Sequence, residues 1–409
     1  MKILYINYLY SPHIGGGAEI TIKSIVEGIQ RLGHEVVVLA TGPGVGLSEE
    51  KVDGVRVYRA GIENLYWPFE AGERGALAKL SWHWRDRYNA AMGKYVSEVV
   101  RKERPDVASC HNVVGFSVST WDALRSASVP IVQVLHDLYL LCYRSTMFRK
   151  DESCPRQCVS CKLFRTQHAH LSADVDAVVG VSRFVLDKLC GNGYFRSSRQ
   201  LVINNARPIP SRVRARTTTD AVTFGFIGTL VKSKGIEWLI ESFKMIERDG
   251  MSLKIAGRGT DAYVQHLKEL AQDSKIEFVG YVSPSSFFGE IDVSVVPSLW
   301  SDTFPGVAFE SLAYEVPVIA TNRGGLPEIV KHDVAGIICD PDDPGSLANA
   351  MSTIFKDRPR REKMISNARD SVSRLTDMQR MIGEYERLYD ALSASNVKNH
   401  VGGGDRAYR

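Results

Sequence analysis

The sequence lacks long apolar runs, a strong excess of one charge and the glycine signature of nicotinamide enzymes. No apolar stretch approaches the ~20 residues that a membrane-spanning helix needs. A net charge of +4 over 409 residues is too small to indicate a nucleic-acid partner, so none is expected. Gly15, Gly16 and Gly17 do not form the G-x-G-x-x-G pattern. These absences exclude the simplest membrane, nucleic-acid and dehydrogenase interpretations.

The remaining composition is that of a globular protein. Hydrophobic residues make up 44% and charged residues 24% of the chain, whose length suits two or three domains. Residues 1–8 are apolar but run at once into polar and glycine residues, which favours a first buried strand over a signal peptide. The expected location is therefore the cytoplasm or the inner face of the membrane, where cysteine thiols stay reduced.

Strand-like apolar segments alternate with segments of helical period in both halves of the chain. The first half begins this pattern at 3–7 and the second half repeats it from 222–227. Such alternation predicts an α/β fold with two doubly wound parallel sheets, each with helices on its faces. Ligands bind such sheets at the carboxyl ends of the strands. Pro208 and Pro210 mark an extended connection between the halves.

The segment 296–330 carries the most chemical information. Asp302 and Glu310 are separated by seven residues, and Phe304, Pro305, Gly306 and Val307 between them indicate a turn that leads into a helix. Strands are expected on both sides of this segment. The start of a helix directs backbone N–H groups at an anion, and the carboxylates can accept hydroxyl groups. A nucleotide-sugar offers both a diphosphate and hydroxyl groups.

This segment resembles the carboxyl-terminal donor site of family-4 retaining glycosyltransferases, in which two glutamates stand where Asp302 and Glu310 stand here. The glycines before Ala18 and the loop 228–235 resemble two further motifs of that family. The resemblance implies the GT-B fold, with two Rossmann-like domains facing a cleft. It also implies transfer of a hexose from a nucleoside-diphosphate sugar to a carbohydrate or lipid-linked acceptor, in cell-surface polysaccharide or glycolipid synthesis.

The resemblance also implies domain boundaries. Residues 1–205 would form the acceptor-binding domain, with a cysteine-rich loop at 142–161, and residues 206–380 the nucleotide-sugar-binding domain. A helix at 381–395 would cross back to the first domain. The glycine-rich tail at 396–409 is expected to be disordered.

The donor site that the resemblance implies is built around Lys234, which matches a lysine that neutralises the diphosphate. Thr229 stands where the family has an arginine, so Lys232 or Arg258 is a candidate replacement. Glu310 would bind the ribose, while Asp302 and His136 would position the sugar. No metal is required for this chemistry. The other expected donor contacts are Gly16, Gly17, Gly228, Tyr281, Phe304, Pro305, Gly306 and Val307.

His136 follows the predicted strand 131–135, where a side chain can reach a cleft. It matches a histidine that the family places beside the donor sugar, although a histidine at a strand end is often structural. Asp137 is expected to orient His136 or to bind acceptor. His111 and Asn112 follow the preceding strand and are candidate acceptor contacts.

The cysteines near the middle of the first half permit two interpretations. Cys158 and Cys161 have the two-residue spacing of one arm of a zinc site, and Cys142 and Cys154 form a less regular second arm. A structural zinc ion would stabilise this loop. The alternative is four reduced cysteines, some of them packed as small apolar residues.

Aromatic and basic residues are interleaved in one stretch of the first half: Trp67, Phe69, Arg74, Lys79, Trp82, Trp84, Arg85 and Arg87. This pattern is typical of a surface that contacts a membrane, but also of an aromatic core with solvated charges. Two alternatives to a transferase remain open. One is a non-catalytic nucleotide-sugar-binding or scaffold relative, favoured by Thr229 and Asp302. The other is a GT-B sugar-nucleotide epimerase or phosphorylase.

Overall fold

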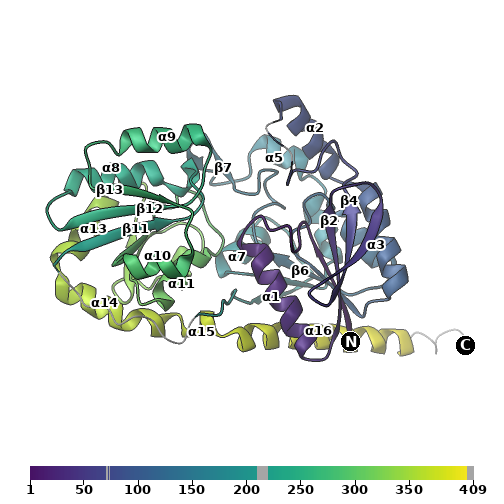
Figure 1. Ribbon diagram of the computed structural model, residues 1–409. Helices are drawn as coiled ribbons and strands as arrows, with labels where there is room; N and C mark the ends of the chain where they lie inside the picture. The colour runs from purple at the N-terminus through teal and green to yellow at the C-terminus, as the bar shows by residue number, and fades with distance from the viewer. Residues whose placement is uncertain (71, 73, 210–219, 403–409) are drawn as a thin grey trace, which may run out of the picture. The chain divides into compact units, whose positions relative to one another are not determined.

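The computed structural model describes residues 1–70, 72, 74–209 and 220–402. The chain divides into two compact units (Figure 1). Unit 1 contains Met1–Ser145, Arg156–Asn205 and the chain from Gln379 onward, whereas unit 2 contains Thr146–Pro155 and Ala206–Met378. The segment 146–155, which the sequence placed in the cysteine-rich loop of the first domain, therefore belongs to unit 2.

Unit 1 contains an eight-stranded sheet with the order β10-β9-β6-β5-β1-β2-β4-β3. Its strands are β1 (Lys2–Asn7), β2 (Glu35–Gly42), β3 (Leu47–Val52), β4 (Val55–Gly61), β5 (Val107–Cys110), β6 (Ile131–Leu135), β9 (Ala177–Gly180) and β10 (Arg199–Val202). All neighbouring strands are parallel except β3 and β4. The prediction of parallel α/β sheets is confirmed for most of this unit, and the antiparallel edge strand β3 is an addition to it.

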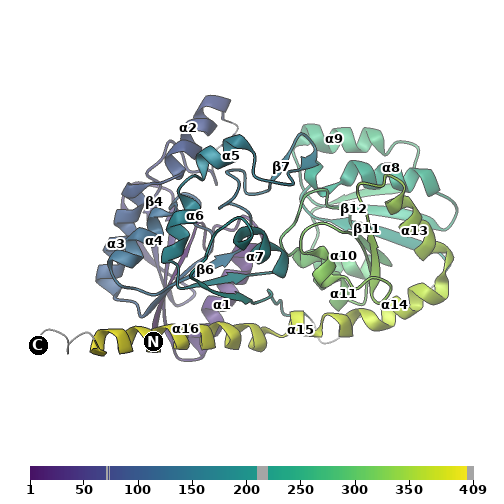
Figure 2. The ribbon, with the colours of Figure 1, turned by 180° about the vertical axis from the view of Figure 1, so that it is seen from behind.

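Helices cover both faces of this sheet. Helix α1 lies on one face, and α3 and α4 lie on the other (Figures 1 and 2). A single helix was expected from Trp84 to Lys102, but Asn89 caps a new helix by accepting a hydrogen bond from the N–H of Met92. The helices are α1 (Gly17–Arg31), α2 (Ala76–Asp86), α3 (Ala90–Glu103), α4 (Ser119–Ser126), α5 (Val159–Phe164), α6 (His168–Leu171), η1 (Ser172–Asp174) and α7 (Arg183–Cys190).

Unit 2 contains a six-stranded, wholly parallel sheet with the order β13-β12-β11-β14-β15-β16. The strands are β11 (Val222–Ile227), β12 (Met251–Ala256), β13 (Ile276–Gly280), β14 (Val293–Val296), β15 (Val318–Thr321) and β16 (Gly336–Cys339), with a short hairpin of β7 (Phe148–Arg149) and β8 (Glu152–Ser153). The helices are η2 (Lys232–Lys234), α8 (Ile236–Ile246), α9 (Asp261–Leu270), α10 (Pro284–Glu290), α11 (Gly306–Ala313), α12 (Leu326–Ile329), α13 (Ser346–Lys356), α14 (Arg358–Ser371) and α15 (Ser373–Thr376).

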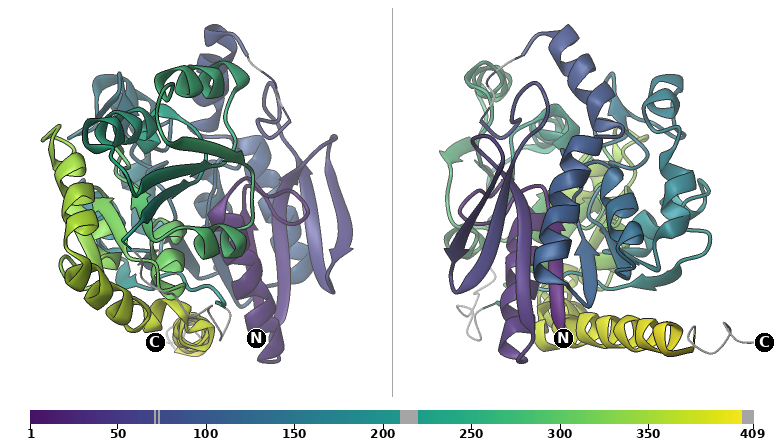
Figure 3. Two further views of the ribbon diagram at one scale, coloured as in Figure 1. Left: turned by 60° about the vertical axis from the view of Figure 1, so that its left-hand side comes forward. Right: turned by 90° about the vertical axis from the view of Figure 1, so that its right-hand side faces the viewer.

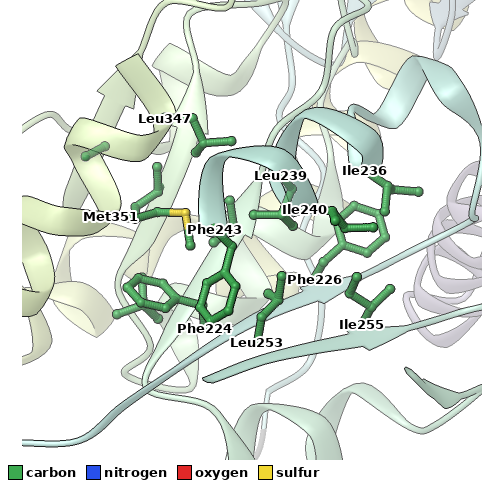
Figure 4. Close-up of a cluster of buried hydrophobic side chains, with 14 of the residues drawn as sticks. Phe224, Phe226, Ile236, Leu239, Ile240, Phe243, Leu253, Ile255, Leu347 and Met351 are labelled. Atoms are coloured by element: carbon green, nitrogen blue, oxygen red, sulfur yellow. The ribbon is translucent and has the colours of Figure 1, made fainter. Parts of the chain in front are cut away.

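The core of unit 2 is a cluster of buried apolar side chains between β11 and the helices α8 and α13. Phe224 of β11 packs against Phe243 of α8, Phe226 lies beside Ile236 and Ile240 of the same helix, and Met351 of α13 belongs to the same cluster (Figure 4). On the other face of β11, a Cβ at Gly225 would contact Ile291 and Phe287, which shows how closely α10 packs there. Truncation of such a buried aromatic residue costs about 3–5 kcal/mol.

Helix α16 (Met378–Gly402) belongs to unit 1 from Gln379 onward and lies beside β1 (Figure 3). Its contacts with the unit include Ile382, which fills the space above Gly28, and Glu386, whose Oε1 lies 2.9 Å from Nε2 of His34. The predicted crossing helix at 381–395 lies inside α16. The helix continues through 396–402, where a disordered tail was expected, and residues 403–409 lie outside the described part of the chain.

Candidate functional site

The loop that follows β11 is held against the loop that follows β14, at the carboxyl edge of the unit 2 sheet. Gly235 has φ +73°, and a Cβ there would overlap the carbonyl oxygen of Pro297, so only glycine fits. The N–H of Leu299 donates to the carbonyl oxygen of Ser233 over 2.9 Å. These contacts fix the position of Lys234, the residue before this glycine.

Lys234 forms an ion pair with Asp302. Its Nζ lies 2.5 Å from Oδ2 of Asp302 and 5.1 Å from the centre of the Trp300 ring. Only 8% of Asp302 is exposed, and its carbonyl oxygen accepts a 2.7 Å hydrogen bond from the N–H of Gly325. The structure therefore brings together two residues that the sequence placed in the donor site separately, one as a cation and one as an acid.

Glu310 lies one turn into α11 and is paired with Arg207. The distance from Arg207 Nε to Glu310 Oε1 is 2.7 Å. Burial raises the pKa of Glu310, while the charge of Arg207 and its hydrogen bond oppose this rise. A Cβ at Gly306 would lie 3.1 Å from Glu310 Oε1, so glycine at the start of α11 leaves room for the carboxylate. Arg207 was not predicted as a site residue.

The other predicted donor residues of unit 2 differ in how far they are exposed to solvent. Phe304 and Pro305 are buried, and the Phe304 ring packs on Phe309 at 5.8 Å. Val307 packs against a small apolar cluster with Phe287. Gly228 is half-buried, and Thr229 is exposed. Residues 304–307 thus close the start of α11 on its buried side.

Both candidate replacements for the missing arginine have other partners. The Lys232 ammonium lies 3.7 Å from Asp151 Oδ2, and both side chains are exposed. The Arg258 guanidinium stacks over the ring of Tyr281 at 4.5 Å. Exposed pairs of this kind contribute little to stability, so both cations are available to an anionic ligand.

In unit 1, the ends of β1, β5 and β6 bring together the predicted acceptor residues. Asn112 donates from its backbone N–H to Asn7 Oδ1 over 2.9 Å and from its side chain to Asp137 Oδ2 over 3.4 Å. Burial raises the pKa of Asp137 to about 6, and the N–H of Tyr139, which donates to Oδ1 over 2.7 Å, opposes this rise. The pKa of Asp137 therefore lies well above that of an ordinary aspartate.

His111 and His136 form a direct pair. Nδ1 of His111 lies 2.9 Å from Nε2 of His136, and the rings stack with centres 5.2 Å apart. Burial lowers the pKa of His136 to about 4 and that of His111 well below its ordinary value. Both imidazoles are therefore neutral at pH 7, and one hydrogen is shared between the two facing nitrogens.

The predicted glycines Gly16 and Gly17 lie at the start of α1. The N–H of Gly16 donates to Oε2 of Glu19 over 2.8 Å, which satisfies one backbone group at the helix terminus. Gly17 is the first residue of the helix. The motif therefore has a structural role in capping, and its contact with the donor stays a prediction.

A buried charge cluster that the sequence did not indicate supports the acceptor residues. The Asp86 carboxylate accepts hydrogen bonds of 2.7 Å from the Tyr139 hydroxyl and from the N–H of Gly115. Burial raises the pKa of Asp86 to about 6, and the charge of Arg165 opposes this rise. The guanidinium of Arg165 stacks on Tyr139 at 4.1 Å. Tyr139 is thereby fixed, and with it the N–H that binds Asp137.

The predicted four-cysteine zinc site is not supported. The described residues contain no group of three or more His, Cys, Asp or Glu side chains arranged to hold a metal ion. Sγ of Cys161 lies 3.6 Å from Sγ of Cys142, and Sγ of Cys158 lies 3.2 Å from Oγ of Ser160. Cys154 lies in the 146–155 segment of unit 2, so the predicted ligand set is divided between the units.

The aromatic residues predicted either as a membrane surface or as core divide into both classes. Trp67 and Trp82 are buried, whereas Phe69 and Trp84 are exposed. Trp84 packs edge-on against Phe164 of α5, so α2 and α5 lie side by side (Figure 2). None of the helices in the described ranges is both long and apolar enough to cross a membrane.

Comparison with known proteins covers both units. A family model described as glycosyl transferase 4-like domain matches residues 16–206, and one described as glycosyl transferases group 1 matches 211–371. An uncharacterized glycosyltransferase of Methanocaldococcus jannaschii is 28% identical over 392 residues, which cover 91% of this chain and 93% of the relative. The capsular polysaccharide biosynthesis glycosyltransferase CapM of Staphylococcus aureus is 31% identical over 177 residues, 42% of this chain and 46% of CapM.

A solved structure shares the fold of the chain. The structure of HepE from Anabaena, in complex with UDP and glucose, matches with a TM-score of 0.69 and 19% identity, over 95% of this chain and 99% of HepE. The two family models together span most of the sequence, and both describe glycosyltransferases. The chain therefore belongs to the family-4 type of glycosyltransferases with the GT-B fold.

Proposed function

We propose that this glycosyltransferase moves a hexose from a nucleoside-diphosphate sugar to a carbohydrate or lipid-linked acceptor, with retention of the anomeric configuration. The observation that carries the proposal is the Lys234–Asp302 ion pair at the carboxyl edge of the unit 2 sheet. An ammonium group, a carboxylate and the N-terminus of α11 follow neighbouring strands there. These groups match the diphosphate, the sugar hydroxyls and the leaving phosphate of such a donor.

Donor binding changes the partner of Lys234 in this proposal. The diphosphate carries more negative charge than Asp302, so the ammonium turns from the carboxylate to the phosphate oxygens. Asp302 then accepts a hydrogen bond from a hydroxyl group of the sugar. A cation that binds the departing phosphate stabilises charge that develops in the transition state. Lys232 and Arg258, which occupy exposed pairs, add to this field.

The ribose binds Glu310. One carboxylate oxygen is held by Arg207, whose charge opposes the rise in the pKa of Glu310 that burial causes. The other oxygen accepts the ribose hydroxyl groups. The HepE complex with UDP and glucose supports a uridine donor for a protein of this fold.

Unit 1 supplies the acceptor side. His136 borders the transferring sugar, and Asp137, Asn112 and His111 shape the place where the acceptor hydroxyl enters. Retention needs no nucleophile from the protein, since the leaving phosphate takes the acceptor proton on the same face of the sugar. The match to CapM supports an acceptor from polysaccharide assembly.

A lipid-linked acceptor requires contact with a membrane, and unit 1 has a suitable surface, which we call the α2–α5 patch. Its apolar members are Leu77, Leu80, Trp84, Val159 and Leu163, of which Leu77 is 81% and Val159 is 84% exposed. Its cations are Lys79, Arg85, Arg87 and Lys162, and the one acid within the two helices, Asp86, is fully buried. Such a surface fits an anionic bilayer, where apolar side chains enter the interface beside basic ones.

The donor assignment is tested by thermal shift. Nucleotide-sugars are screened for stabilisation of the purified protein, because a ligand that binds the native state raises apparent stability. The donor so identified is then incubated with acceptor candidates, and the anomeric configuration of the product is read by NMR. An inverted product would refute retention. Stabilisation by a donor without turnover would favour the scaffold alternative.

The membrane contact is tested by sedimentation with vesicles that contain phosphatidylglycerol. Binding should fall in Leu77→Ser/Val159→Ser and persist in the matched double variant Val45→Ser/Met245→Ser, which removes two exposed apolar residues elsewhere. Equal binding of both double variants would exclude the α2–α5 patch.

A further inference from the structure

A chain of hydrogen bonds joins helix α16 to His136 inside unit 1. The Tyr389 hydroxyl donates to Ser109 Oγ over 2.9 Å, and Ser109 Oγ lies 3.1 Å from Nε2 of His111. Nδ1 of His111 lies 2.9 Å from Nε2 of His136. Tyr389, Ser109 and His111 are buried. The four side chains come from α16, β5 and the ends of two neighbouring strands.

Counting hydrogens gives this chain a direction. Tyr389 uses its one hydrogen on Ser109, so the Ser109 hydrogen must go elsewhere. Nε2 of His111 is the acceptor within reach, which leaves the His111 hydrogen on Nδ1. His111 then donates to Nε2 of His136, and the hydrogen of neutral His136 is on Nδ1.

The opposite direction leaves a buried donor without an acceptor. If His136 donated to His111, then His111 would donate to Ser109, which would receive two hydrogen bonds. With the Tyr389 hydroxyl donating to Ser109, as it does here, the hydrogen of Ser109 would then have no acceptor in the hydrogen bonds of the described residues. An unsatisfied buried donor costs about 1–3 kcal/mol. This difference is enough to select one tautomer.

The backbone of His111 is fixed by two hydrogen bonds. The backbone N–H of His111 donates to the carbonyl oxygen of Ile6 over 2.9 Å, and the backbone carbonyl oxygen of His111 accepts from Gln133 Nε2 over 2.7 Å. The ring of Tyr5 stacks on the imidazole ring of His111, with the ring centres 5.8 Å apart. The low pKa values of His111 and His136 agree with this arrangement, since a second proton on the pair would place two donors face to face.

We propose that Ser109 and Tyr389 are positioning residues that hold His136 as the neutral Nδ1–H tautomer for the transfer step. The proposal rests on the proposed function for the role of His136 beside the sugar. A neutral imidazole with this tautomer directs an N–H away from His111 and brings no positive charge that would compete with Lys234 for the phosphates. Ser109 and Tyr389 act through His111.

The test compares three variants. Ser109→Ala removes the donor to His111, and Tyr389→Phe removes the hydroxyl that orients Ser109. Tyr385→Phe is the matched control, because Tyr385 is a buried tyrosine of the same helix whose hydroxyl has no hydrogen-bond partner in the described chain. The readouts are kcat and KM, and the 15N NMR signals of the histidine ring nitrogens, assigned by comparison with His136→Asn.

In the wild type, Nδ1 of His136 is expected to be protonated and Nε2 bare. Ser109→Ala should give a mixture of tautomers and lower kcat at least about tenfold, with KM for the donor little changed. Tyr389→Phe should show a smaller loss of about threefold. Tyr385→Phe should match the wild type.

A wild-type spectrum with the hydrogen on Nε2 overturns the proposal. So does an unchanged kcat in folded Ser109→Ala and Tyr389→Phe. Because the spectrum is recorded without substrate, it decides the tautomer even for an inactive protein, and absence of transfer in the wild type would count against the proposed function instead. If Ser109→Ala fails to fold, Tyr389→Phe carries the comparison.

Discussion

The ammonium nitrogen of Lys234 lies 2.5 Å from Oδ2 of Asp302, so each residue neutralises the charge of the other in the absence of donor. Lys234→Ala should therefore have two effects. It removes the cation that stabilises the leaving phosphate, which should lower kcat/KM at least about 100-fold. It also leaves a nearly buried carboxylate unpaired, which should lower the melting temperature. Steady-state kinetics with the donor found by thermal shift measures the first effect, and calorimetry the second.

Lys275→Ala is the matched control for this experiment. Lys275 also forms a lysine–aspartate pair in unit 2, with Asp249 at 2.9 Å, but both of its residues are exposed. Its removal should change neither kcat/KM nor stability by a measurable amount. Equal kinetics for the two variants would contradict the role of Lys234.

The Arg207–Glu310 pair predicts a pH dependence of donor binding. Burial raises the pKa of Glu310 and Arg207 opposes the rise, so Arg207→Ala should raise this pKa further. The ribose needs the ionised carboxylate. When the pH is lowered, the Arg207→Ala variant should therefore lose donor affinity at a higher pH than the wild type does. Titration calorimetry at several pH values measures the shift, and Arg207→Lys should restore most of the wild-type profile. A variant whose affinity is weaker by the same factor at every pH would exclude the charge argument.

Alanine substitutions at Gly235 and Gly280 distinguish the cost of backbone strain from the cost of steric overlap. Both have positive φ, +73° and +71°, but a Cβ at Gly235 would overlap Pro297 whereas a Cβ at Gly280 has nothing within 4 Å. Gly280→Ala should cost about 1–2 kcal/mol, from the left-handed conformation alone. Gly235→Ala should cost about 1–3 kcal/mol more and lower activity, because the overlap moves the loop that carries Lys234. Urea denaturation measures both costs, and equal costs would refute the overlap.

The cysteines of unit 1 should differ in reactivity. Hydrogen bonds from Ser160 and from the N–H of Cys161 lower the pKa of Cys158, while the hydrogen bond to Cys142 and burial raise that of Cys161. Because the thiolate is the reactive form, iodoacetamide at pH 8 should modify Cys158 first. Mass spectrometry after timed quenching identifies the order, and Ser160→Ala should slow the reaction of Cys158. If Cys142, Cys158 and Cys161 all resisted iodoacetamide until a chelator was added, the result would instead indicate bound zinc.

The sequence predicted the central strands of both sheets well, because their apolar runs and the turns between them are local signals. A strand at 55–58, within β4, was predicted, but β3 and its hairpin with β4 were missed although the turn has a clear signal. Asp53 and Gly54 form the connection with φ of 49° and 84°, the conformation that Asp-Gly favours between two strands. The polar composition of β3, an edge strand, concealed it.

The partners of the predicted site residues were not accessible from the sequence. Arg207 lies in the connecting segment, and nothing nearby in the chain indicates that it pairs with Glu310. Ser109 sits inside a buried strand, where a small polar residue is unremarkable until Tyr389 and His111 are placed beside it. Motifs identify residues that meet a ligand, whereas residues that support them are identified only by distances in space.

Because α16 completes unit 1, the order of synthesis has a consequence for folding. Tyr385 and Tyr389 are buried within unit 1, and both follow the whole of unit 2 in the chain. Unit 2 ends at Met378, so all of its residues are translated earlier. The sheet of unit 1 is therefore completed only after unit 2 has been translated, and a nascent chain that stalls before α16 leaves Tyr5 and Gly28 without their contacts to Tyr389 and Ile382.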